Sequence, residues 1–196
     1  MLVRVGQEVQ EVPRGRAAPS PPLADDGVRL EPLAAKFAPD FDRLLRDSDI
    51  VRHTRVPTKP PAGFAASWVD RYVAGWADGT RAGFAILSAA EDDFLGMAAL
   101  VDLDLPARQA EIGYIVSPEA RGRGVASRAL RLITDWSLGP LGLERVELRI
   151  DVANTASIRV AERLGYVREG VLRSLHLKED LRSDVAIYSR LAGDGE

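Results

Sequence analysis

The chain has 196 residues, which suggests one domain large enough to bury a hydrophobic core. Hydrophobic residues make up 46% and charged residues 28%, as in ordinary soluble proteins, and the net charge of −3 argues against a nucleic-acid-binding surface. Cysteine is absent, which excludes disulfides, thiolate metal sites and a cysteine nucleophile. No apolar run approaches the ~20 residues of a membrane span, and the start lacks the apolar core of a signal peptide. We expect a cytoplasmic protein that uses no metal and binds neither membrane nor nucleic acid.

The front of the chain differs from the rest. Residues 1–12 alternate β-favouring apolar residues with polar ones and predict a short strand. Residues 13–27 contain four prolines and are typical of a linker. We therefore treat 1–27 as an N-terminal extension and 28–192 as the domain. A strand at 1–12 would pair with a sheet edge of the same chain or of a partner, so a monomer and a homodimer both remain open.

After this extension the pattern alternates between strand and helix periods. One expected helix, 63–77, carries Phe64, Trp68, Tyr72 and Trp76 at helical spacing, which favours a core face over a substrate entrance. The strands are expected at 28–33, 83–87, 94–100, 110–116, 145–150, 166–177 and 184–190, and the other helices at 39–47, 124–138 and 155–164.

Residues 111–136 predict a strand, a glycine-rich loop and a helix. Ser117 and Pro118 end the strand, because proline cannot continue a hydrogen-bonded ladder. Gly122 and Gly124 permit positive φ and the close approach of a ligand to the main chain. Unpaired N–H groups and the helix dipole at the start of the helix favour a phosphate group. The segment is either a pyrophosphate cradle or a solvated basic helix start, and its arginines are Arg121, Arg123, Arg128 and Arg131.

A second segment begins at Asn154, where an expected strand gives way to the helix 155–164. Asn154 and Ser157 are both typical helix-capping residues, which is one explanation for their presence. The other explanation comes from a family resemblance.

The motif Arg121-x-x-Gly124-x-Ala126 is similar to the Arg/Gln-x-x-Gly-x-Gly/Ala signature of the GNAT N-acyltransferase superfamily. The resemblance covers about residues 28–192. Within that superfamily the chain resembles the ribosomal-protein-alanine N-acetyltransferase (RimJ/RimL-type) branch, through Asn154, Ser157, Gly165-Tyr166, Glu169-Gly170, Leu172-Arg173, Asp184 and Tyr188.

The resemblance implies an α/β (α+β) fold with a mixed, mostly antiparallel, twisted sheet of about seven strands. Helices would cover both faces, and the sheet would be splayed between its fourth and fifth strands. It also implies acetyl-CoA as co-substrate and no metal, with the pantetheine arm in the splay. The main chain of Ile115 and Val116 would pair with the pantetheine amides. The pyrophosphate would be held by Arg121, Gly122, Arg123, Gly124, Val125, Ala126 and Ser127, with Asn154 contacting the cofactor from the other side.

The implied chemistry needs a base for the amine, a donor for the developing oxyanion and an acid for the leaving thiolate. With no cysteine, direct attack of the amine on the thioester is the economical mechanism. Glu111 is the candidate base, acting directly or through water, or else a charge at a strand edge. The Val116 N–H is the candidate oxyanion donor, and Ser157 is the candidate acid, since the branch places a hydroxyl near the CoA sulfur there.

Two departures from related enzymes narrow these roles. Ala161 stands where many members carry a tyrosine acid, so the acid is Ser157, Tyr166 or water, and Tyr166 more plausibly packs in the core. Arg149 stands where some N-terminal acetyltransferases carry a glutamate, which leaves Glu111 ahead of Glu147 and Asp151 as the base.

Three functions are therefore open. The first is acetylation of a primary amine at a protein N-terminus, whose pKa near ~8 eases deprotonation. The second is acetylation of a small molecule such as an amino acid, a polyamine or an antibiotic. The third is a non-catalytic acyl-CoA-binding protein. A cationic acceptor would suit the acidic loop residues Glu91, Asp92, Asp93, Asp102 and Asp104, although acidic loops are common in proteins of this charge.

Overall fold

The computed structural model describes residues 18–20 and 22–194, so the strand expected at 1–12 lies outside the described residues. Within that part, eight strands form one sheet in the order β1-β2-β3-β4-β5-β6-β8-β7. Only the β5–β6 pair is parallel, and every other neighbouring pair is antiparallel. The strands are β1 (Leu23–Ala24), β2 (Val28–Pro32), β3 (Ala82–Ser88), β4 (Phe94–Asp104), β5 (Gln109–Val116), β6 (Arg145–Asp151), β7 (Val167–Lys178) and β8 (Leu181–Leu191).

The mixed, mostly antiparallel sheet is confirmed, with one strand more than expected. The additional strand is β1, which lies in the stretch interpreted as linker and pairs with β2. The Asp25 carboxylate accepts hydrogen bonds from the N–H groups of Gly27 and Val28, each at 2.9 Å, and so turns the chain from β1 into β2.

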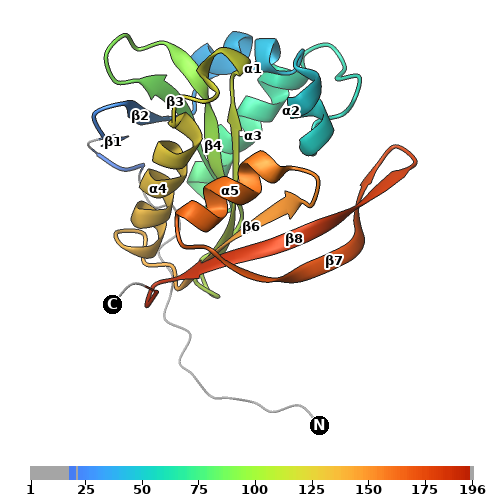
Figure 1. Ribbon diagram of the computed structural model, residues 1–196. Helices are drawn as coiled ribbons and strands as arrows, with labels where there is room; N and C mark the ends of the chain where they lie inside the picture. The colour runs from blue at the N-terminus through green and yellow to red at the C-terminus, as the bar shows by residue number, and fades with distance from the viewer. Residues whose placement is uncertain (1–17, 21, 195–196) are drawn as a thin grey trace.

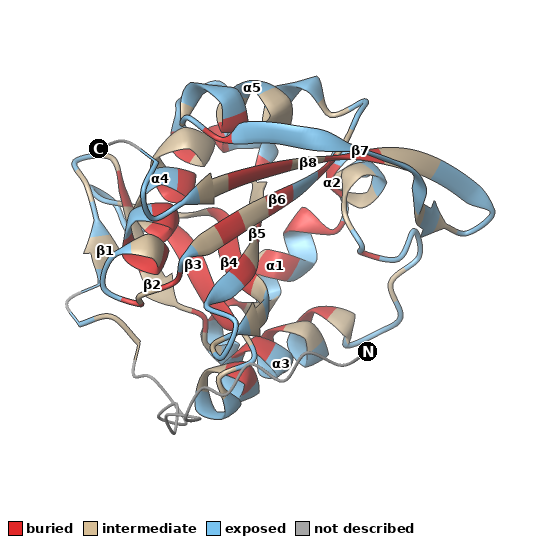
Figure 2. Ribbon diagram, turned by 90° about the horizontal axis from the view of Figure 1, so that it is seen from below, coloured by how far each residue is buried: buried red, intermediate tan, exposed pale blue. Residues whose placement is uncertain are grey.

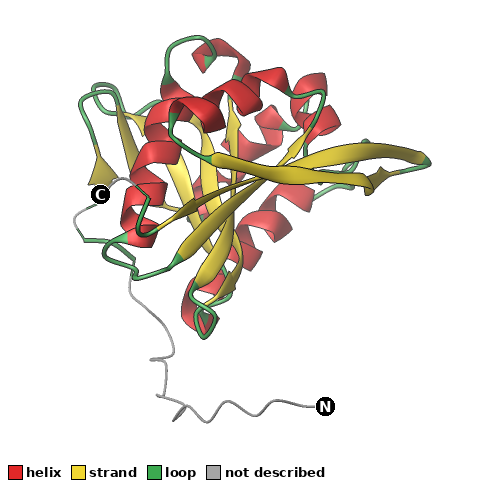
Figure 3. Cartoon of the chain, turned by 60° about the horizontal axis from the view of Figure 1, so that its bottom comes forward, coloured by secondary structure: helices red, strands yellow, loops and turns green. Residues whose placement is uncertain are grey.

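Helices cover both faces of the sheet (Figure 1 and Figure 3). One face carries α1 (Ala38–Leu44), α2 (Ser48–His53) and α3 (Phe64–Asp78), preceded by the 3-10 turn η1 (Ala35–Phe37). The other carries α4 (Val125–Leu138) and α5 (Thr155–Arg163), with the turn η2 (Pro118–Ala120) ahead of α4. No helix in the described ranges is long and apolar enough to cross a membrane.

Strand alternation divides the buried residues into two cores, one under each helical layer. Phe84 and Leu100 belong to the core under α4 and α5. Met97 belongs to the core under α1 and α3. In that second core Trp68 stacks on Phe41 with ring centroids 4.6 Å apart, so the aromatic stripe of α3 is a core face, as its spacing favoured.

The sheet parts between β5 and β6. Their parallel register runs from Gln109 opposite Arg145 to Glu111 opposite Glu147 and goes no further. Beyond Glu111 the two strands diverge, and β6 pairs only with β8 on its other side. These strands correspond to the fourth and fifth expected from the sequence, so the splay is where it was predicted.

The last two strands form a long hairpin that projects beyond the helices (Figure 1 and Figure 2). Nearly all of β7 is exposed. Its outer end lies near α2, because Lys178 of β7 donates a hydrogen bond to the Val51 carbonyl of α2.

Candidate active site

The gap between β5 and β6 leaves main-chain groups of β5 without a neighbouring strand. The Ser117 N–H donates to the Leu95 carbonyl of β4 at 2.8 Å. Because main-chain groups alternate in direction along a strand, those of Ile115 also point toward β4, whereas those of Tyr114 and Val116 point toward the gap. The geometry therefore favours Val116, and in addition Tyr114, over Ile115 as a site for an added extended ligand.

The glycine loop leads from this gap into α4. Gly122 and Gly124 have φ of +75° and +79°, a left-handed conformation that favours glycine. A Cβ built on either glycine would meet no atom within 4 Å, so the loop faces open space. No side chain caps the start of α4. The N–H groups of Val125, Ala126 and Ser127 are then available to an anion, as the sequence predicted for this segment.

Arg121, the first residue of the motif, forms ion pairs with two aspartates at the start of α2. Its guanidinium contacts Asp47 at 2.6 Å and Asp49 at 3.4 Å. Asp47 also caps α2 by accepting the Ile50 N–H at 2.8 Å. Burial raises the pKa of Asp47, but the hydrogen bonds from Arg121 and Ile50 lower it below its usual range. Arg121 therefore fixes α2 beside the loop, a contact that the sequence did not predict.

The other arginines of this segment divide into two groups. Arg128 and Arg131 contact Asp25 at 3.1 Å and 2.7 Å and so join α4 to the start of β2. Arg123 is the one arginine of the segment with no ion pair among the residues described. Arg123 is therefore the arginine of this segment whose charge no described acidic residue neutralises.

Across the gap, Asn154 and Ser157 begin α5. The Asn154 Oδ1 accepts the Ser157 N–H at 3.1 Å, so Asn154 caps the helix. The cap uses the main chain of Ser157, and the Ser157 hydroxyl lies beside that of Tyr114. A role of Asn154 toward a cofactor stays a prediction.

Tyr114 lies next to Ser157 and was missed in the sequence. Its hydroxyl is fully buried and has no hydrogen-bond partner within the described chain. Burial raises the pKa of Tyr114, an effect that the neighbouring Ser157 hydroxyl opposes. A buried hydroxyl without a partner costs roughly 1–3 kcal/mol, and a small movement of the neighbouring Ser157 hydroxyl would supply one.

Glu111 lies where β5 and β6 begin to part, on the face opposite Tyr114. Its side chain is 11% exposed and contacts Arg55 at 2.9 Å and Arg149 at 3.4 Å. Burial raises the pKa of Glu111 above its usual value, although both arginines oppose the rise. A carboxylate with a raised pKa suits a general base, but the two arginines occupy its oxygens in this state.

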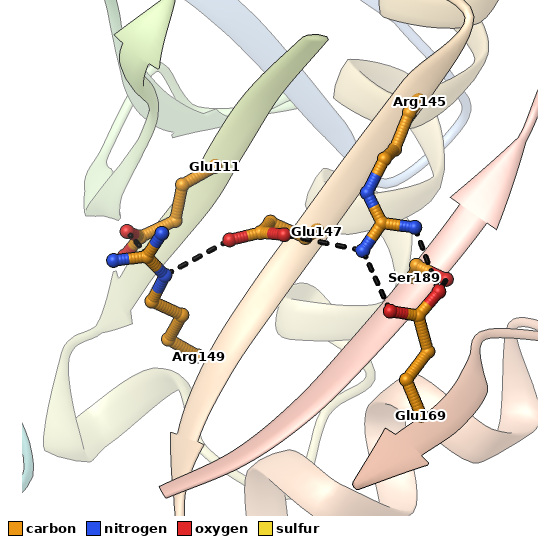
Figure 4. A network of polar contacts seen from close by, with 6 residues as sticks. All are labelled: Glu111, Arg145, Glu147, Arg149, Glu169 and Ser189. Carbon is orange, nitrogen blue, oxygen red and sulfur yellow. Dashed lines mark hydrogen bonds and ion pairs between the residues drawn. The ribbon is translucent and has the colours of Figure 1, made fainter. Parts of the chain in front are cut away.

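Glu111 begins a network of charges that crosses the sheet to β7 (Figure 4). Arg149 joins Glu111 to Glu147, and Arg145 joins Glu147 to Glu169. The Arg145 and Ser189 hydrogen bonds lower the pKa of Glu169 to about 2. Glu147 is thus held between two arginines, one on each side.

The remaining candidates for proton transfer are occupied. Burial raises the pKa of Asp151, but hydrogen bonds from Ser183 and the Ala153 N–H lower it below its usual range, which makes Asp151 a weak base. The buried Tyr166 hydroxyl lies 2.6 Å from the Thr134 hydroxyl, and burial raises its pKa, so Tyr166 packs in the core as expected. No group of three or more histidine, cysteine or acidic residues in the described ranges is arranged to hold a metal ion.

A mixed sheet that parts between two parallel strands, with an uncapped helix beginning beside the opening, is the GNAT architecture that the sequence resembled. Residues 28–167 match the family model described as an acetyltransferase (GNAT) domain. The chain therefore belongs to the GNAT acetyltransferase family.

Its relatives include enzymes with different acceptors. A putative ribosomal N-acetyltransferase of Bacillus subtilis, YdaF, is 35% identical over 101 residues, which is 52% of this chain and 55% of the relative. A spermidine N(1)-acetyltransferase of Escherichia coli is 36% identical over 77 residues, or 39% of this chain and 41% of that enzyme. The match thus spans about half the length of each of these two relatives.

The fold is also that of solved acetyltransferases. A structure of RimL, a ribosomal L7/L12 α-N-protein acetyltransferase, in complex with coenzyme A superposes with a TM-score of 0.79. At 18% identity, over 87% of this chain and 96% of that one, the likeness concerns the fold.

Proposed function

We propose that this protein transfers an acetyl group from acetyl-CoA directly to a primary amine, the α-amino group of a peptide or protein N-terminus. One observation carries the proposal: an uncapped helix start, a strand edge without a neighbour and a largely buried carboxylate all meet at the β5–β6 gap. The first suits a pyrophosphate, the second a pantetheine arm and the third an amine.

The residues of the gap fit this co-substrate. The main chain from Gly122 to Ser127 would hold the pyrophosphate, assisted by Arg123, and the main chain of Val116 would hold the pantetheine arm. Asn154, on the opposite side, would add a contact through its side-chain amide. Bound acetyl-CoA supplies the acetyl group as a reactive thioester, and no metal is required.

Four groups of the chain would then serve the transfer. Glu111 takes the proton of the amine, directly or through water, and its raised pKa supports that role. The Val116 N–H, which points toward the gap, stabilises the developing oxyanion. Ser157 donates its proton to the leaving thiolate. Tyr114, whose raised pKa keeps it protonated, would donate a hydrogen bond to the Ser157 hydroxyl once that hydroxyl moves within reach, and would so orient it.

Acetylation of a small amine is the second candidate, and the spermidine-acetylating relative is the observation that favours it. A non-catalytic acyl-CoA-binding role is disfavoured, because Glu111 and Ser157 are both present and lie at the gap. Cytoplasmic location and a monomeric or homodimeric state stay predictions.

The test is a titration of the purified protein with acetyl-CoA followed by an assay of CoA release with peptides, polyamines and aminoglycosides. We expect binding, and release that depends on a primary amine. Absence of acetyl-CoA binding would contradict the proposal. Because the chain has no cysteine, a thiol reagent reports only the CoA that is released.

A further inference from the structure

A cleft of about 720 Å³ lies between the α2–α3 loop and the outer end of the β7–β8 hairpin. The loop contributes Thr54 to Lys59, and the hairpin contributes Leu175 to Glu179. Its volume falls within the about 300–1,000 Å³ typical of ligand sites. Arg55 lines the cleft, and its guanidinium lies 2.9 Å from Glu111, so the cleft opens beside the candidate base.

Hydrogen bonds join the hairpin wall of the cleft to the end of α2. The Lys178 ammonium on the hairpin donates hydrogen bonds to the carbonyls of Val51 and, at 3.2 Å, of Thr54. These carbonyls lie at the end of α2, where the helix dipole favours a cation. The cleft is thus a formed part of the fold, held by a bond across it.

Charge differs between the cleft and the candidate base beside it. Glu111, which Arg55 contacts at 2.9 Å, is acidic, and Asp102 is near enough to raise the pKa of Glu111. On the walls Arg55, Lys59 and Lys178 face one carboxylate, that of Glu179. Lys59 has no ion pair with any residue the structure describes, so its charge is available to a ligand.

The cleft also presents apolar surface. The Leu175 and Leu177 residues, on its hairpin wall, are 47% and 53% exposed. Exposed leucines beside a binding cleft favour a partner that carries apolar side chains. A linear polyamine offers ammonium groups joined by short methylene chains, and its second ammonium would meet the basic walls.

We propose that the acceptor is a peptide α-amine followed closely by acidic and apolar residues. This rests on the proposed function and adds the substrate class. The amine lies at Glu111 beside the cleft, the acidic side chains contact Lys59 and Arg55, and an apolar side chain contacts Leu177. Polyamines are excluded by the same basic walls.

The arrangement links recognition to the base. Arg55 reaches both the cleft and Glu111, so an acceptor carboxylate competes with Glu111 for its guanidinium. Partial withdrawal of Arg55 removes one of two cations that hold Glu111 in its charged form. Glu111 then becomes a better proton acceptor when an acidic peptide is bound.

The experiment compares kcat/KM for short peptides with free N-termini that differ only at their second and third residues, which are aspartate, asparagine or lysine. Spermidine is the fourth substrate. We expect the aspartate peptide to exceed the lysine peptide by about tenfold, since contacts with two wall cations each contribute up to about fivefold. Rising salt should reduce the difference.

Lys59→Gln tests the wall directly, with Lys36→Gln as the matched control. Lys36 is an exposed lysine that pairs with Glu31 and does not line the cleft. We expect Lys59→Gln to lower the aspartate preference about threefold and Lys36→Gln to leave it unchanged. An unchanged preference in Lys59→Gln, or spermidine as the best substrate, would overturn the inference while leaving acetyl transfer intact.

A wild-type protein that acetylates none of these amines would instead count against the proposed function. The cleft would still be tested by calorimetric binding of the aspartate and lysine peptides to the wild type and to Lys59→Gln. Equal binding of both peptides would then overturn the inference.

Discussion

Arg55 and Glu111 are 56 positions apart in the chain and lie 2.9 Å from each other in the fold. The arginine opposes the rise in pKa that burial imposes on Glu111. As the proposed base, the carboxylate would accept a proton only above its pKa, which this arginine lowers.

The pH dependence of kcat/KM should report the opposing effects of burial and of Arg55 on the pKa of Glu111. Because Glu111 must be deprotonated, kcat/KM falls as the pH drops through its raised pKa, giving an acidic limb above the usual value of 4.5. Arg55→Gln removes a cation, raises that pKa further and moves the limb to higher pH. A limb that stays in place in Arg55→Gln would mean that another group controls it.

Glu111→Gln should lower turnover by roughly 10²- to 10⁴-fold, the usual contribution of a general base. Because Glu111 lies on the face away from the glycine loop, acetyl-CoA affinity should remain close to that of the wild type. The measurements are kcat by CoA release and Kd by calorimetry. Retained turnover would remove Glu111 from the mechanism.

Ser157→Ala should slow turnover without disturbing α5. The helix cap joins the Asn154 side chain to the Ser157 N–H, which alanine retains. Thermal stability should therefore match the wild type, whereas Asn154→Ala should cost about 1 kcal/mol through loss of the cap. If Ser157→Ala is fully active, Ser157 serves only the start of the helix.

Tyr114→Phe tests whether the Tyr114 hydroxyl contributes to turnover or only to the packing of the core. Removing a buried hydroxyl without a partner should stabilise the ligand-free protein by about 1 kcal/mol, or about 2–4 °C in Tm. Turnover should fall at the same time, because Ser157 loses its neighbour. A variant that is less stable and equally active would show that Tyr114 only packs.

The proposed contact between the glycine loop and the pyrophosphate can be tested at Gly124, with Gly142, a glycine of the same conformation, as the control. Gly124 and Gly142 have φ of +79° and +77°, and a Cβ on either would meet no atom within 4 Å. Alanine should cost each site a similar 1–2 kcal/mol or so of stability. Only Gly124→Ala should weaken acetyl-CoA binding, by about tenfold, the worth of one hydrogen bond to a charged group. Equal affinities would place the pyrophosphate elsewhere.

Much of this fold follows from local pattern. Pro118 ends β5, Gly124 precedes α4 and Asn154 caps α5, so each boundary of the gap is encoded by residues beside it. The helix α2 was not predicted, since six residues carry no periodicity, and its cap depends on Asp47 held by Arg121. β1 was hidden in a proline-rich stretch, where pairing with β2 overrides local preference.

The site was predicted less completely than the fold. No sequence pattern pointed to Arg55 as a site residue, because its contact with Glu111 joins segments that are 56 positions apart. The sequence pattern predicts Tyr114 only as a strand residue, and the structure is needed to show that its hydroxyl is buried without a hydrogen-bond partner. Arg121 was expected to help hold a pyrophosphate, but its guanidinium is bound by Asp47. Arg128 and Arg131 of the same segment are bound by Asp25 of the β1–β2 turn.

In the proposed mechanism, acetyl passes directly from acetyl-CoA to an amine at the β5–β6 gap. Intact-mass spectrometry can follow this transfer, with the protein incubated first with acetyl-CoA alone and then with an acidic peptide added. We expect an unmodified protein in both samples and a peptide carrying one acetyl group on its α-amine, formed far more slowly by Glu111→Gln. An acetylated protein that passes its acetyl group to the peptide, or a peptide that stays unmodified, would contradict this mechanism.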